Sequence, residues 1–203
     1  ALLAISNILQ PFLSFGTQHA VIRYYSKYIK KREKDGLLTL SILIPLTIII
    51  LFIPLFFAYY NDIRQYLFQN DQSLSRYAYV IIYIAISTSF FEIFYSWLRV
   101  KLKSVFGNFL KELYPRLLIS ILLVSYSLEI LNFEEFILFL IYGYYIRLII
   151  VVIYSFYIIK PKINISFKDD FGEIFKYCLL IFLSGAASSI ILDIDKSMLS
   201  SIL

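Results

Sequence analysis

The chain has little of what most catalytic sites are built from: one histidine and one cysteine among 203 residues. One cysteine cannot form a disulfide within the chain, and one histidine with one cysteine cannot supply a usual metal site. The sequence also has no HExxH, GxSxG, GxGxxG, P-loop or CxxC motif. We therefore expect no enzyme activity, no metal and no cofactor.

Charged residues are scarce as well, at 16% of the chain, whereas apolar residues make up 60%. A soluble globular domain has about a quarter charged and about half apolar residues. This composition leaves too little polar surface to cover a water-facing globule, so we expect lipid to surround much of the chain. A strongly apolar soluble domain is the alternative, and the long apolar runs argue against it.

These runs predict an all-α fold, a polytopic transmembrane helix bundle. A helix needs about twenty apolar residues to cross the hydrocarbon, because its backbone polar groups must bond internally there. About six spans are expected, of which the second, third and fifth are the clearest; they lie at residues 1–21, 37–60, 77–98, 105–128, 134–159 and 174–200. The chain starts and ends inside apolar segments, so we expect it to be a piece of a longer membrane protein.

The basic residues predict the orientation of this bundle. Residues 23–36 hold six Lys and Arg, residues 99–116 hold five and residues 160–176 hold four, which is 15 of the 19. Short loops rich in Lys and Arg stay in the cytoplasm, so these three loops are predicted to be cytoplasmic and able to touch anionic lipid headgroups. Nucleic-acid binding is the alternative for a basic run, but it does not suit this apolar chain. The predicted location is the cytoplasmic (inner) membrane, as a multi-pass protein.

Ionisable residues at bilayer depth are the candidate functional residues, because a charge there is costly. Glu92 and Arg147 lie at similar depths, so they can form an ion pair that either lines a hydrophilic cavity or only locks two helices together. Arg23 and His19 share a face at the cytoplasmic end of the first span. Arg23 is either a snorkelling anchor or a cation at the cavity mouth, and a lone His19 is more typical of an interface than of a proton relay.

The last span carries three further charges. Asp193 and Lys196 are three residues apart and can pair, whereas Asp195 points away and needs another partner or water. The small residues at 184–189 let helix backbones approach closely. These charges are candidates for ion coupling or helix pairing, either in a cavity open to the outside or in interfacial water.

Three segments of the sequence carry a family pattern. They are "SNILQPFLSFGTQHAVIRYYSKY" continued by "EKDGLLTLSILIPL", then "FFEIFYSWLRVKLKSVFGNFLKELYPRLLISILLV", and last "FLSGAASSIILDIDKSML". They resemble, in that order, the second-span region, the fourth and fifth spans with their amphipathic hinge, and the opening of the second half of bacterial polysaccharide flippases. These flippases belong to the multidrug/oligosaccharidyl-lipid/polysaccharide exporter superfamily.

The resemblance implies a two-lobed transporter of about twelve to fourteen helices that works by alternating access. Residues 1–173 would belong to the first lobe and residues 174–203 to the first span of the second lobe. The implied substrate is a polyprenyl-diphosphate-linked oligosaccharide, flipped to the outer leaflet for cell-surface polysaccharide biosynthesis. The implied partners are this lipid-linked glycan, membrane lipids and polysaccharide-assembly proteins, and nucleic acid is not among them.

The resemblance also implies roles for individual residues. Arg23 and Arg147 match the cations that this family uses against diphosphate or acidic sugars, and Glu92 would balance Arg147 or couple to cation movement. Asp193 and Asp195 depart from the pattern, because they add negative charge to an anion route.

Other functions stay open at this stage. A drug/cation antiporter of the same superfamily would use Glu92, Asp193 and Asp195 as titrating groups. A net cationic cavity favours the flippase and a net anionic cavity favours the antiporter. A membrane-embedded polysaccharide polymerase or acyltransferase usually needs a larger external loop than this chain has, and a structural scaffold would not need intramembrane charges.

Overall fold

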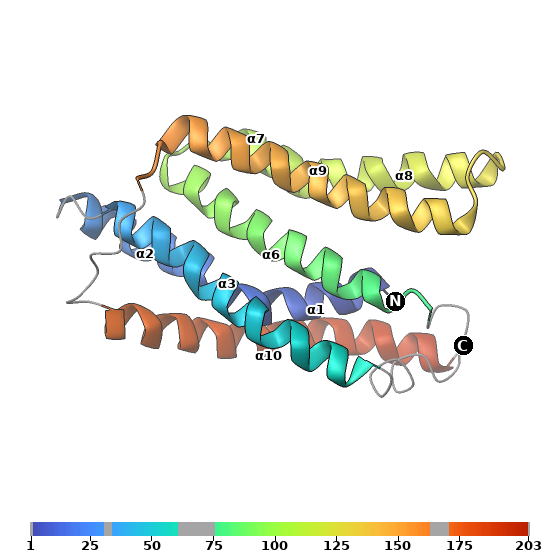
Figure 1. Ribbon diagram of the computed structural model, residues 1–203, viewed down its shortest axis with the longest axis horizontal. Helices are drawn as coiled ribbons and strands as arrows, with labels where there is room; N and C mark the ends of the chain where they lie inside the picture. Colours follow the sequence, from blue (N-terminus) through green and yellow to red (C-terminus); the bar gives the residue numbers. More distant parts are fainter. Residues whose placement is uncertain (1, 31–33, 61–75, 163–170, 203) are drawn as a thin grey trace.

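A computed structural model of the chain describes residues 2–30, 34–60, 76–162 and 171–202, with side chains at all of these except residues 30, 34, 186 and 188–202. Every element within these ranges is a helix, which confirms the predicted all-α class. The helices run back and forth along the long axis of the molecule (Figure 1). The last turns of α2, α6 and α9, which lead into the three predicted cytoplasmic loops, lie together at the left end of that view.

The first predicted span is divided into two helices, α1 (Leu2–Ser14) and α2 (Thr17–Lys30). Phe15 and Gly16 between them have φ angles of 50° and 68°. A Cβ atom on Gly16 would lie 2.9 Å from the carbonyl oxygen of Cys178 in α10 (Phe171–Ile202). Glycine is required at position 16, because a Cβ there would meet this backbone oxygen, in addition to the strain of the left-handed backbone that Phe15 also adopts. The prediction of one helix over residues 1–21 is therefore wrong.

Three helices in the described part of the chain are long and apolar enough to cross a membrane: α3 (Lys34–Ala58), α6 (Tyr79–Val100) and α9 (Phe133–Ile159). In α3 the candidate span begins at Asp35. They correspond to the predicted spans 37–60, 77–98 and 134–159, and they indicate a membrane protein. The most apolar stretch of α6 is 72% buried, against 28% for α3 and 33% for α9. The central helix is thus α6, and the outer two present apolar side chains to the surroundings, as lipid contact requires.

The predicted span 105–128 is built from three consecutive elements: α7 (Ser104–Asn108), the π-helix η1 (Phe109–Leu113) and α8 (Tyr114–Ser127). Pro115 follows the π-helical turn and lacks the N–H that an α-helix would donate to the carbonyl of Lys111. With 14 residues, α8 alone is shorter than the roughly twenty needed to cross the hydrocarbon. Residues 105–128 are divided among three elements, and the long α10 is not one of the three helices above. The total of six spans therefore stays a prediction.

Polar side chains join the helices inside the apolar bundle. Trp97 of α6 donates from Nε1 to Oγ of Ser41 in α3 at 3.1 Å. Ser87 of α6 donates to the carbonyl of Tyr144 in α9 at 2.9 Å. Ser6 of α1 donates to a carbonyl of α6 at 3.1 Å. Hydrogen bonds of this kind hold helices together where no water competes for the donors, so α1, α3 and α9 keep fixed positions around α6.

Candidate functional site

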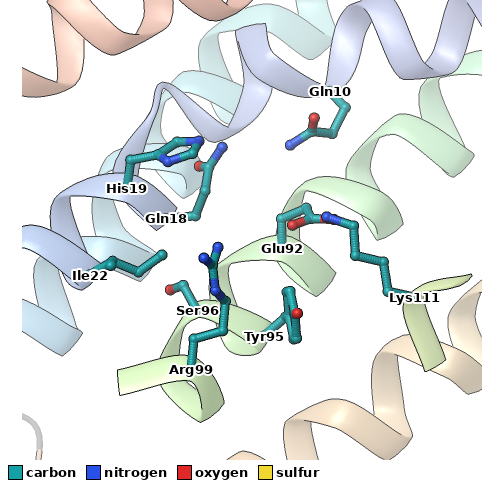
Figure 2. Close-up of a pocket in the computed structure, with 9 residues that line it drawn as sticks. All are labelled: Gln10, Gln18, His19, Ile22, Glu92, Tyr95, Ser96, Arg99 and Lys111. Carbon is teal, nitrogen blue, oxygen red and sulfur yellow. The ribbon is translucent and has the colours of Figure 1, made fainter. Parts of the chain in front are cut away.

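A polar pocket lies between α6 and the hinged pair α1 and α2, with η1 at its edge (Figure 2). Its volume is about 210 Å³. Nine side chains line it, and all but one of them carry a polar or charged group: Gln10, Gln18, His19, Ile22, Glu92, Tyr95, Ser96, Arg99 and Lys111. Such a concentration of polar groups beside the most buried apolar helix marks this pocket as the candidate functional site.

Helix geometry explains why these side chains meet. In α6 the pocket residues are Glu92, Tyr95, Ser96 and Arg99, a spacing of i, i+3, i+4 and i+7 that defines one face of an α-helix. The hinge at residues 15–16 turns α2 so that Gln18 and His19 face this stripe. Arg99 points from α6 toward the side chains of α2 (Figure 2).

Glu92 forms an ion pair with Lys111 of η1, with Oε1 and Nζ 2.8 Å apart. The Glu92 side chain is 18% exposed and that of Lys111 is 38% exposed, so this contact is shielded more than an ordinary surface pair. The Lys111 ammonium also lies 5.4 Å from the centre of the Tyr95 ring. The phenol of Tyr95 donates a hydrogen bond to Oδ1 of Asn108 in α7, which holds the ring in place beside the pair.

The expected Glu92–Arg147 ion pair is wrong for this conformation, because Glu92 faces the pocket and takes Lys111 as its partner. Arg147 lies in α9 and is 4% exposed. Its guanidinium carbon is 4.2 Å from the centre of the Phe91 ring and 4.8 Å from that of Tyr144. Its Nε and Nη2 atoms have no hydrogen-bond partner among the described residues. Arg147 is therefore a buried cation held between two aromatic rings, outside the lining of the pocket.

Arg23 also lies outside the pocket lining, although His19 on the same helix belongs to it. The Arg23 guanidinium lies 4.4 Å from the centre of the Tyr177 ring in α10. Close by, Tyr24 and Lys27 contact the carboxylate of Glu173 at 3.2 Å and 3.4 Å. Arg23 thus takes part in a polar contact between α2 and α10. The side chains of Asp193, Asp195 and Lys196 lie outside the described residues.

The sequence-based candidates included Glu92 and His19 but missed Arg99, Lys111, Gln10 and Gln18. The spacing from residue 92 to residue 99 is a signal that could have found Arg99, because it places one more charge on the face of Glu92. No local pattern indicates Lys111, because its position depends on how the π-helical turn packs against α6.

The pocket has a small excess of positive charge. Its lining holds the two cations Arg99 and Lys111, one carboxylate and one histidine. Among the described residues, Glu92 neutralises Lys111, and no ion pair involves Arg99. Guanidinium groups and amides are good hydrogen-bond donors for phosphate and carboxylate oxygens. The arrangement can therefore hold a small anionic group.

Comparison with protein-family models, curated proteins and solved structures gave no match.

Proposed function

We propose that this chain is part of a membrane transporter that flips polyprenyl-diphosphate-linked oligosaccharide across the cytoplasmic membrane for cell-surface polysaccharide biosynthesis. The observation that carries the proposal is the net positive pocket beside α6, lined by Arg99 and Lys111. A sugar diphosphate cannot cross hydrocarbon unaided, so its carrier must offer polar donors within an apolar bundle. Sparse charges that converge on one pocket meet this need.

The size of the pocket limits what it can hold. Its volume of about 210 Å³ is below the usual range for small-molecule sites of about 300–1,000 Å³. This volume suits a headgroup such as the diphosphate better than a whole oligosaccharide. We infer that the pocket is a subsite for the anionic headgroup and that the glycan occupies space outside it.

The charge of the pocket also bears on the antiporter alternative. An organic cation would need an excess of carboxylates in the lining, whereas Glu92 is already paired with Lys111 and Arg99 adds positive charge. The positive balance therefore supports the flippase over the drug/cation antiporter. Like-charge repulsion would oppose entry of a cation.

The experiment replaces Arg99 and Lys111 separately with glutamine in the full-length protein, in cells that lack the native copy and make the glycan. We expect both variants to reduce surface glycan strongly while they accumulate normally in the membrane. Arg116→Gln is the matched control, because Arg116 is 78% exposed and, of the described residues, forms an ion pair only with Glu112 on its own helical segment. Normal glycan display with both pocket variants would refute the flippase, and loss of organic-cation export with intact glycan would favour the antiporter.

A further inference from the structure

The cost of burying the charged Arg147 side chain is only partly compensated in this conformation. The residue is 4% exposed, and within the part of the chain that the structure describes its Nε and Nη2 atoms have no hydrogen-bond partner. The rings of Phe91 and Tyr144 offset part of the cost of burial. A buried cation is normally paired with a carboxylate as well, because desolvation costs several kcal/mol per ion. A carboxylate that reaches Arg147 in a second conformation would supply this partner.

Glu92 is the one acidic side chain of the described residues at the depth of Arg147. It follows Phe91, on whose ring the guanidinium lies. Glu134 and Glu135 lie in the first turn of α9, at least twelve residues from Arg147 and about 18 Å away along the axis. The other described carboxylates are near helix ends or exposed: Asp35, Glu112, Glu129 and Glu173.

Lys111, the partner of Glu92, lies on a helical turn that is not α-helical. Lys111 is the central residue of the π-helical turn Phe109–Leu113. A π-helical turn contains more residues than an α-helical turn, and such turns are frequent at functional sites. When the turn relaxes to α-helical hydrogen bonding, the residues on one side rotate by about 100° relative to the other side. Such a register change moves the Lys111 side chain away from Glu92 and breaks their ion pair.

We propose that Glu92 exchanges cationic partners. In the conformation observed it pairs with Lys111, and no carboxylate of the described residues pairs with Arg147. In the second conformation the π-helical turn changes register, Glu92 pairs with Arg147, and Lys111 becomes available to an anion in the pocket. The identity of that anion rests on the proposed function, whereas the exchange of partners does not.

The test measures how fast the Lys111 amine reacts in the purified full-length protein in lipid nanodiscs. Short pulses of acetic anhydride acetylate free amines, and mass spectrometry reports the modification of each lysine, with the exposed Lys103 as an internal reference. Arg147→Met removes the second partner of Glu92, so Lys111 stays paired and we expect its acetylation to slow several-fold. Glu92→Gln removes the pair itself, so acetylation of Lys111 should accelerate.

Two controls complete this design. Arg116→Met removes a positive charge from the same segment and should leave the acetylation of Lys111 unchanged, and Arg147→Lys should keep most of the native rate. An unchanged Lys111 rate in Arg147→Met would overturn the exchange, because a static Glu92–Lys111 pair does not sense Arg147. If the methionine variant fails to fold, Arg147→Gln is judged by the same criterion.

Inorganic pyrophosphate separates the two proposals. In the native protein it should protect both Lys111 and Arg99, the latter measured by phenylglyoxal modification. If pyrophosphate protects neither residue in the native protein, the result counts against the diphosphate subsite of the proposed function. A slower Lys111 reaction in Arg147→Met would still support the exchange in that case. Protection by pyrophosphate with an unchanged Lys111 rate in Arg147→Met would support the subsite and overturn the exchange.

Discussion

Oε1 of Glu92 lies 2.8 Å from Nζ of Lys111, and this contact ties the π-helical turn η1 to the central helix α6. The pair decides the character of the pocket, because it neutralises one of its two cations and leaves Arg99 as the remaining positive charge. Arg147, whose guanidinium lies over the Phe91 ring, has no carboxylate partner among the described residues.

The strength of the Glu92–Lys111 contact can be measured with a double-mutant cycle. We expect Glu92→Gln and Lys111→Met to show a coupling energy of about 1 kcal/mol in the free energy of unfolding, because both side chains are partly shielded from water. The exposed pair Glu112–Arg116, with atoms 3.7 Å apart, is the control and should give a coupling near zero. Equal coupling in the two pairs would contradict the shielded contact.

The hinge between α1 and α2 should depend on glycine. Gly16→Ala places a Cβ 2.9 Å from a backbone oxygen of α10 at a φ of 68°, so we expect it to lower the free energy of unfolding by about 1–3 kcal/mol. Gly172→Ala is the matched control, because nothing lies within 4 Å of its Cβ, and the added methyl should be neutral or slightly stabilising. Thermal unfolding in detergent measures both. A stable Gly16→Ala protein would show that the close approach to α10 is absent.

Arg147 should be required for transport and not for stability. Arg147→Met removes a buried cation whose Nε and Nη2 lack partners among the described residues and leaves an unbranched apolar side chain that needs none, so we expect unfolding stability equal to native or higher by up to about 2 kcal/mol. Lys111→Met should instead destabilise by about 1 kcal/mol or less, because Glu92 loses the partner it has in this conformation and has to take Arg147 in its place. Surface glycan should fall with both variants. A strongly destabilised Arg147→Met protein would make Arg147 a structural residue.

The orientation of the helices is testable with single cysteines. Lys103→Cys should react with a membrane-impermeant maleimide only from the cytoplasmic side, and Ile130→Cys, at a 67% exposed position, only from the outside, since the basic loops stay inside. The native Cys178 is buried, so its background reaction should be small, and Cys178→Ser is the control for it. Labelling on the opposite sides would reverse the topology.

Much of the fold could be predicted from local patterns. Long apolar runs around residues 37–60, 77–98 and 134–159 indicated helices that the structure confirms as α3, α6 and α9, because apolar length is a property of the chain itself. The breaks within residues 1–21 and 105–128 were missed. They depend on the left-handed backbone at Phe15 and Gly16 and on the π-helical turn before Pro115, which apolar composition does not reveal.

The candidate site could be predicted only in part. A charge at membrane depth is unusual enough to be noticed from the sequence alone, so Glu92 was found, together with Arg147, which lies outside the pocket lining. Which cation meets Glu92 was not predictable, because Lys111 and Arg147 lie on different elements and the choice depends on how each of these elements is rotated against α6.

By itself, the order of amino acids determined that this protein is helical, that its long apolar helices suit lipid, and which loops are predicted to face the cytoplasm. Composition and the placement of basic residues act along the chain, so they need no knowledge of which helices touch. Only the tertiary structure decided that Glu92 binds Lys111, that Arg99, His19 and two glutamines share its pocket, and that Arg147 stands apart between two rings. Those facts depend on the packing and rotation of helices that are distant in sequence, which no single segment encodes.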